Sequence, residues 1–476
     1  MMKDFVRKVG FGIGPDEKVP TDPLEWAKNQ FNFVPNFKWG GKKIYTEKEL
    51  REFINKYSLK DRKKIREKYK DDPDTLKKEQ KKLRLKTGRG HWINLELSIR
   101  HTEAIQGNSP VFTKLWYFWA NHFTISSIKQ LQQFSTGAYQ RESIRANMDQ
   151  TFEKMAFEAT VAWPMIRHLD NSQNIGPDSP VGLKRASKGK EATINENHAR
   201  ELLELHTVSP NSGYNQEDVI QMSYLMSGWK SKKNKEGRFS DVYFEQNIHQ
   251  PGRKRILGLG YGQGEKGLLK VIRDLAKNQS CREFIAMKLC RYLITDYPTK
   301  EMTAPIVEAW KKSDGFLPEI HKAAIEVAFN YSPMYRKFQN PENWLLQMVK
   351  MTGADIIPSF EVMDDHVLGD KIKKSQKVSH NLLRDIGHHP YFSKQPNGWS
   401  DISDDWMSPE LLIRRLVYSK EVYNKIKKNN RSNDFYAEMI LKNFDNPNQI
   451  LKTLNKKKDP IDRHILLFNL PEVLKS

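Results

Sequence analysis

The chain has 476 residues, and its 38% hydrophobic content and 11 Trp exclude a disordered chain. It carries 79 Lys+Arg against 58 Asp+Glu, a net charge of +21, and its two cysteines exclude a disulfide scaffold. Charged residues interrupt every apolar stretch before the roughly 18 residues of a membrane span, so no span is expected. The first twenty residues contain no apolar run of the kind that marks a secretory signal.

Much of the positive charge is concentrated in one segment. Residues 42–89 carry 19 Lys+Arg against 9 Asp+Glu, a surplus of ten. Such a segment suits a basic arm for a nucleic acid, an anionic polysaccharide or an acidic partner. The favoured interpretation is a solvated helical excursion with oppositely charged side chains three and four residues apart. Because aromatic residues that stack on bases are nearly absent, nucleic acid is not an expected partner.

Helical periodicity dominates the rest of the chain. Apolar residues recur every three or four positions in 92–106, 110–123, 139–168 and 270–294, which predicts a mainly α fold. Asn215 with Asp218 three residues later predicts a helix start, and Ser408 before Pro409 predicts another. No internal repeat is evident.

Strand signals are confined to one stretch. Residues 238–261 contain two alternating runs around Pro251-Gly252, which predicts a small antiparallel β-hairpin with a Pro-Gly turn. The following residues, GQGEKG at 262–267, match the GxGxxG pattern of dinucleotide-binding turns. No alternating strand–helix–strand pattern flanks them, so a nucleotide site is not indicated and no organic cofactor is predicted.

The segment from Glu196 to His206 is the richest in polar side chains. On a helix of about 100° per residue its carboxylates share one face with a guanidinium and a carboxamide, whereas leucines line the other face. Crowded carboxylates suit acid/base chemistry, and the guanidinium suits an anionic substrate group. The alternative is an exposed face with Glu196–Arg200 and Arg200–Glu204 ion pairs, with His206 a core histidine.

Several motifs resemble DUF1800, a bacterial family known only as a domain of unknown function. They are FWANHFTIS (118–126), MIRHLDNSQNIGPDS (165–179), the long segment 195–229 around NENHARELLELH, FEQNIHQPGRKRILG (244–258) and GHHPYFSKQPNGWSDISDDWMSPELLIRRL (387–416). The resemblance implies a mainly helical core over 91–418, preceded by an N-terminal helical flank (1–41) and a Lys-rich basic insertion (42–90), and followed by a C-terminal helical flank (419–476). At Arg291-Tyr292 relatives usually have a histidine followed by a phenylalanine.

The resemblance also bears on partners and on location. Members of the family are generally exported, whereas this chain shows no signal sequence, so its compartment stays open. Their genes often neighbour those of a family with an alkaline-phosphatase-like fold, which implies a partner of that kind. The family supplies no established reaction.

The polar members of these motifs predict one shared site. The expected catalytic residues are Glu201, Glu204, His122, His206 and His249. The expected substrate-binding residues are Arg200, Asn197, Asn171 and Trp229, and if a divalent cation is bound, Asp170 and Glu196 are its candidate ligands.

We therefore expect an acid/base enzyme, a hydrolase or a lyase, that acts on an anionic and possibly carbohydrate substrate. The alternative is a binding or scaffold protein that docks an acidic partner or polymer on its basic surface, with the polar helix as a buried ion-pair network. As a group, Trp119, Trp163, Trp229 and Trp399 are expected in the core more than as sugar platforms.

Overall fold

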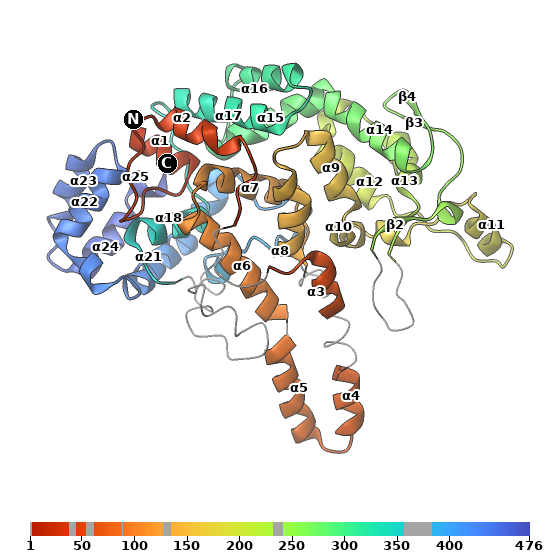
Figure 1. Ribbon diagram of the computed structural model, residues 1–476, viewed down its shortest axis with the longest axis horizontal. Coiled ribbons are helices and arrows are strands. Elements are labelled where there is room, and N and C mark those ends of the chain that lie inside the picture. The colour runs from red at the N-terminus through yellow and green to blue at the C-terminus, as the bar shows by residue number, and fades with distance from the viewer. Residues whose placement is uncertain are drawn as a thin grey trace.

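The computed structural model describes residues 2–37, 44–53, 61–87, 89–126, 135–231, 241–356 and 383–476. The fold is mainly α, as predicted, and the described strands form two small antiparallel pairs (Figure 1). Among the described residues, no helix combines the length and the apolar character that a membrane crossing requires.

The first half of the fold is helical throughout. Its helices are α1 (Met2–Val9), α2 (Pro23–Lys28), α3 (Glu47–Phe53), α4 (Asp61–Lys68), α5 (Pro73–Thr87), α6 (Arg89–Gln106), α7 (Pro110–His122), α8 (Thr136–Tyr139), α9 (Phe152–Val161), α10 (Trp163–His168), α11 (Pro180–Ala186), α12 (Asn197–Glu201) and α13 (Gln216–Met226).

The second half begins with the strands. The elements are β1 (Trp229–Lys230), β2 (Tyr243–Phe244), β3 (Lys254–Ile256), β4 (Leu259–Tyr261), α14 (Gly264–Lys277), α15 (Gln279–Leu293), α16 (Lys300–Lys312), α17 (Leu317–Tyr331), α18 (Pro341–Thr352), α21 (Pro409–Tyr423), α22 (Asn433–Asn443), α23 (Pro447–Leu454), α24 (Pro460–Phe468) and α25 (Pro471–Leu474).

The helix starts predicted from side-chain caps are confirmed. Asn215 accepts a hydrogen bond from the Asp218 N–H, and Asp218 accepts one from the Asn215 N–H, so α13 begins with a capping box. Ser408 likewise accepts from the Leu411 N–H at the start of α21.

Two predicted helices are interrupted. The segment 139–168 breaks after Asn147 and at Ala162, and 270–294 breaks at Asn278, which caps α15.

The predicted hairpin is present, but its turn lies elsewhere. Strands β3 and β4 pair antiparallel, and the left-handed residues Leu257 and Gly258 connect them. Strand β2 pairs with β1 instead. The expectation of a Pro251-Gly252 hairpin turn is therefore wrong, because the first alternating run finds its partner upstream in the sequence.

Helix α6 lies between three groups of buried apolar residues. Its Ala104 belongs to the main core, built around α7, α9 and α13–α17. Its Ile93 and Leu97 belong to a C-terminal core formed with α18 and α21–α25. Its Trp92 and Leu95 pack with Leu50 of α3. A helix buried on all sides must pair its polar side chains internally, and α6 does so with arginines and glutamates.

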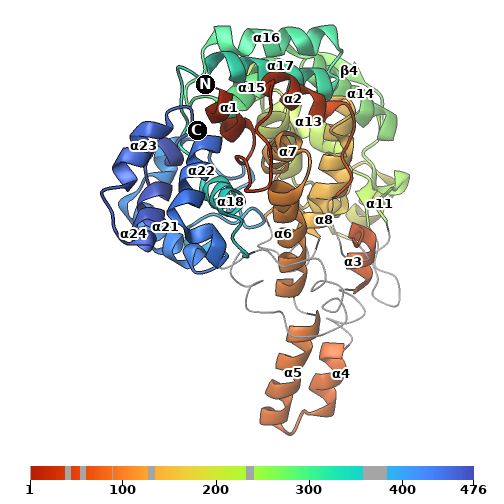
Figure 2. The same cartoon turned by 60° about the vertical axis from the view of Figure 1, so that its left-hand side comes forward.

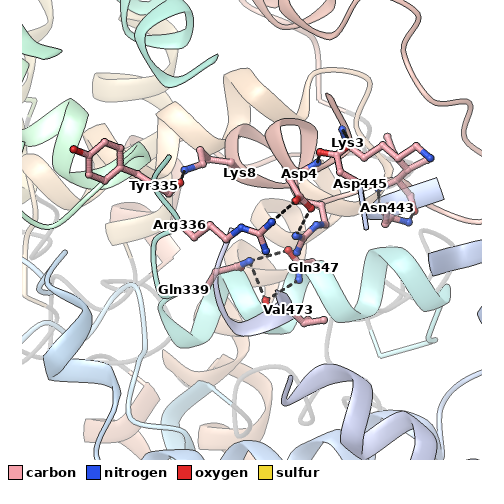
Figure 3. A network of polar contacts seen from close by, with 12 residues as sticks. Lys3, Asp4, Lys8, Tyr335, Arg336, Gln339, Gln347, Asn443, Asp445 and Val473 are labelled. Atoms are coloured by element: carbon pink, nitrogen blue, oxygen red, sulfur yellow. Dashed lines mark hydrogen bonds and ion pairs between the residues drawn. The ribbon is translucent and has the colours of Figure 1, made fainter. Parts of the chain in front are cut away.

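The two ends of the chain meet on one side of the molecule (Figures 1 and 2). Asp445, which follows α22, accepts hydrogen bonds from the first N–H groups of α1, and Asp4 accepts from Arg7 at 2.7 Å and from Arg336 at 2.9 Å (Figure 3). Phe5 of α1 lies in the main core. The division of the chain at residues 41, 90 and 418 stays a prediction.

Helices α4 and α5 project from the body as an arm (Figures 1 and 2). Ile65, Tyr69 and Leu76 are half-buried along the contact between the two helices. Lysines cover the outer side of α5, where Lys77, Lys78, Lys81 and Lys82 are all exposed. The Lys-rich segment thus forms two helices over residues 61–87, and lysines of α5 are exposed on it.

Candidate functional site

An open cleft of about 830 Å³ lies where three distant parts of the chain converge. Leu205 comes from the polar helix, and Phe284, Lys288 and Arg291 come from one side of α15. The remaining lining residues lie between 384 and 405, and all but Arg384 belong to the motif at 387–416. The lining carries the cations Lys288, Arg291, Arg384 and Lys394 against the carboxylates Asp401 and Asp405, a surplus of two positive charges.

The end of α7 fixes the far wall of this cleft. The Asn121 carboxamide accepts a hydrogen bond from the Trp399 N–H at 2.8 Å and donates one to the Trp399 carbonyl at 2.9 Å. A Cβ atom on Gly398 would lie 2.6 Å from the Asn121 carbonyl, and Gly398 has a φ of +80°. Only glycine permits this close approach. The Asn-His and Gly-Trp motifs therefore form one structural unit.

His122, the next residue, holds a lysine of the cleft. Its Nδ1 accepts a hydrogen bond from Lys288 Nζ at 3.0 Å, and its Nε2 donates to the His206 carbonyl at 3.1 Å. Burial, then Lys288 and His206, keep the pKa of His122 well below its ordinary value. A neutral ring with its proton on Nε2 satisfies both contacts.

Two ionisable groups of the cleft have shifted pKa values. Burial lowers the pKa of Lys288 to about 8, although Asp401 opposes this shift. Burial raises the pKa of Asp401, against the effect of Lys288, Lys337 and Arg291. An amine that is partly neutral at physiological pH and a carboxyl group whose pKa is raised by burial thus line one cleft.

The expected carboxylate face lies beside the cleft rather than in it. Among the described residues, neither Glu201 nor Glu204 lines the cleft, although both precede Leu205 on the same helical segment. The segment changes from α-helix to a π-helical turn over Leu202–His206, which alters the simple helical projection. Burial and then Glu204 raise the pKa of Glu201, while Glu204 accepts a hydrogen bond from Tyr214 at 2.8 Å.

Arg200 forms one of the two ion pairs expected for it. It contacts Glu196 at 3.2 Å and Gln216 at 2.8 Å, and both it and Glu196 are partly exposed. Asn197 is exposed at the start of α12. Among the described contacts, Arg200 has no ion pair with Glu204, because that carboxylate is turned to Tyr214.

Buried histidines lie behind the cleft. His206 is 1% exposed and His198 is fully buried, and no described residue hydrogen-bonds the ring nitrogens of either. Burial, followed by the charge on Lys288, lowers the pKa of His206 to about 3. His206 packs against Phe123 and His122, with ring centroids 5.2 Å and 6.1 Å away. It therefore supports the His122–Lys288 contact from inside the core.

The other predicted site residues are engaged in holding loops and strands. His249 Nδ1 contacts the Ser227 carbonyl at 2.7 Å, and its Nε2 accepts the Gly264 N–H at 3.0 Å. Asn171 donates to the Met226 carbonyl. Trp229 packs between Phe157 and Phe244.

The candidate metal ligands are also apart from the cleft lining. Asp170 adopts a left-handed conformation at the start of a short 3₁₀ turn, and Glu196 pairs with Arg200. In the part of the chain that the structure describes, no group of three or more His, Cys, Asp or Glu side chains is placed to hold a metal ion.

The GQGEKG turn shows why a nucleotide motif was misleading there. The Gly264 N–H is occupied by His249, and a Cβ atom on Gly267 would lie 2.1 Å from the Gly262 carbonyl oxygen. Gly267 thus allows α14 to pack closely against the residue that follows β4.

We expect Gly267→Ala to lower the free energy of unfolding by about 1–3 kcal/mol through overpacking. Gly262→Ala is the matched control, because nothing lies within 4 Å of its Cβ position. Urea unfolding of both variants checks this, and equal stabilities would contradict it.

Sequence reasoning missed Lys288, Arg291, Asp401 and the role of Asn121. Lys288 and Arg291 stand in a helix whose apolar spacing drew attention to its buried side. Asn121 and Asp401, however, lie within motifs that carry the family resemblance. The available signal was position: Asn121 directly precedes His122, and Asp401 lies two residues after Trp399, both within these motifs.

The fold and the cleft define a mainly α protein with a positively charged cleft between α15 and a C-terminal segment. The chain belongs to the family described as "Protein of unknown function (DUF1800)", whose model matches residues 4–469. The family region thus includes α1 and most of the C-terminal helices. Searches of curated proteins and of solved structures found no match to this chain.

Proposed function

We propose that the protein is an acid/base enzyme that cleaves an anionic, carboxylate-bearing carbohydrate in the α15 cleft, most simply as a lyase. The observation that carries the proposal is the contact between Lys288, which lines the cleft, and the neutral His122 ring behind it. A lyase of this class needs a base, an acid and a group that neutralises a carboxylate. Lys288, Asp401 and Arg291 provide these three.

In the proposed reaction, neutral Lys288 removes the proton from the carbon next to the substrate carboxylate. The electron pair of that C–H bond forms a C=C bond, and the C–O bond to the leaving sugar breaks. Protonated Asp401 gives its proton to the leaving oxygen, and Arg291 stabilises the negative charge that develops on the carboxylate. His122 is a positioning residue, since it holds Lys288 without facing the cleft.

Lys288→Met is expected to lower kcat by about 10²–10⁴-fold, because a general base is lost. In the wild type, activity should follow a bell-shaped pH profile, because the reaction needs neutral Lys288 together with protonated Asp401. The assay follows soluble polyuronates: a lyase forms an unsaturated product that absorbs ultraviolet light, whereas a hydrolase forms new reducing ends without it.

Lys394→Met is the matched control for this experiment. Lys394 is an exposed cation of the same cleft, so its loss should raise KM and leave kcat within a few-fold. Full activity of Lys288→Met would contradict the assignment. If Glu201→Gln alone abolished the activity, the carboxylate face of the polar helix would replace Lys288 as the catalytic group. A hydrolase would then be favoured.

A binding or scaffold role is the second candidate, and the projecting α4–α5 arm favours it. Four exposed lysines of α5, of which Lys82 is paired with Glu79, offer positive charge to an acidic polymer or partner. A wild-type protein that turns over none of the polyuronates but binds them through this arm would support the second candidate. A partner with an alkaline-phosphatase-like fold stays a prediction.

A further inference from the structure

A small polar cavity of about 20 Å³ lies behind the cleft and shares Ser400 and Asp401 with its lining. Three lysines from distant parts of the chain line it: Lys8 of α1, Lys114 of α7, and Lys337 from the connection between α17 and α18. Asp401 is the one Asp or Glu among its lining residues. Counted by side chains alone, the cavity therefore gathers more positive than negative charge.

The three lysines differ in how their charge is compensated. Lys337 pairs with Asp296 and also donates to the Asp401 carbonyl. Lys8 donates to the Tyr335 carbonyl at 2.6 Å, which occupies one of its three N–H groups (Figure 3). Lys114 is only 4% exposed, and among the described residues its ammonium contacts rings alone, those of Phe11 at 5.1 Å and Tyr292 at 5.8 Å.

Burying the Lys114 ammonium without a hydrogen-bond acceptor costs free energy, and the cavity beside it has room for an acceptor. The volume that one water needs is roughly 10–15 Å³ on the same measure. A cavity of about 20 Å³ thus admits one particle of water size and excludes tetrahedral oxyanions such as sulfate.

We propose that this cavity is a binding site for a single small anion, chloride in ordinary salt, held between Lys8 and Lys114. The site shares Asp401 with the cleft, so its test reads stability and bound anion rather than turnover. Its role is to compensate the positive charge where α1 and α7 meet the connection to α18.

The charged neighbours of both lysines give the site a pH dependence. Burial lowers the pKa of Lys114 to about 7, opposed by Glu342. Burial, Arg336, Arg7 and Lys337 lower the pKa of Lys8 to about 7, opposed by Asp4. A bound anion favours the protonated amines, so chloride should bind more tightly at pH 6 than at pH 9.

Two measurements on the full chain test the proposal. Sulfate stabilises folded proteins in general, so the test compares variants. At pH 6 and constant ionic strength, replacing sulfate by chloride should shift the Tm of the wild type about 1–3 °C further upward than that of Lys114→Met. Lys311→Met, which removes an exposed lysine of α16, should respond like the wild type. Crystals grown in bromide should show an anomalous scatterer next to Lys114 Nζ.

The outcomes separate cleanly. If the cavity holds water in bromide-grown wild-type crystals, or if bromide occupies only surface positions, the proposal is overturned. An equal shift of the Tm in the wild type and in Lys114→Met overturns it as well. The crystallographic measurement uses the wild type, so it decides the question even if Lys114→Met does not fold.

Discussion

Acidification from pH 7 to pH 5 is expected to remove several kcal/mol from the free energy of unfolding. The cause is a set of fully buried histidines that are neutral in the folded protein. Burial lowers the pKa of each to about 3 or 4, whereas an unfolded histidine titrates near 6.5. The four are His206, His321, His388 and His464.

The direction follows from proton binding. Between the folded and the unfolded pKa values the unfolded chain holds more protons, so stability rises with pH in this window and falls on acidification. The stability that these histidines contribute is fully present above pH 6.5. It is lost progressively as the pH falls toward 4. Each histidine contributes about 1.4 kcal/mol per pH unit well below 6.5, so four together account for most of a typical stability by pH 5.

Urea unfolding at pH 7, 6 and 5 measures this slope and counts the protons taken up. His464→Phe provides the control, since the ring lies among Tyr423, Tyr436 and Phe468 and receives a hydrogen bond of the Tyr436 hydroxyl on Nδ1. This variant should lose one proton from the uptake below pH 6. A stability that stays flat between pH 7 and pH 5 would show that these histidines are not buried neutral.

The local structure could be predicted from the sequence more completely than the site. Caps such as Asn215 and Ser408 act within a few residues, so their patterns alone located the starts of α13 and α21. The π-helical turn at Leu202–His206 could not be predicted from the sequence. Such a turn accommodates an extra residue in the helix, and tertiary packing rather than local sequence decides where it forms.

The cleft depends on pairings between distant residues. Lys288 meets His122 across 166 positions of sequence, and Asn121 meets Trp399 across 278. Periodicity identifies the buried side of one helix but not the segment that lies against it. His249 is a second example, since this motif histidine contacts the Gly264 N–H and the Ser227 carbonyl, two partners that its motif alone does not indicate.

Glu342→Gln is expected to lower the free energy of unfolding by about 3–5 kcal/mol, because it leaves a buried guanidinium without its counter-charge. Arg100 of α6 donates to both carboxylate oxygens of Glu342 in α18, at 2.8 Å and 3.0 Å, and both side chains are 3% exposed. His101 lies 3.2 Å from the same carboxylate. Burial alone would raise the pKa of Glu342, but Arg100 and His101 hold it well below its usual range.

The matched control is an exposed pair of the same chemistry. Arg273 contacts both carboxylate oxygens of Glu153 at 3.2 Å, with the arginine side chain 56% exposed, so Glu153→Gln should cost less than about 1 kcal/mol. The double variant Arg100→Met with Glu342→Leu tests the cause, because it removes both charges together. It should be more stable than Glu342→Gln if the unpaired charge carries the cost. A double variant less stable than the single one would instead assign the cost to packing. Such a cost would fall on α6, the one helix whose side chains belong to all three described cores.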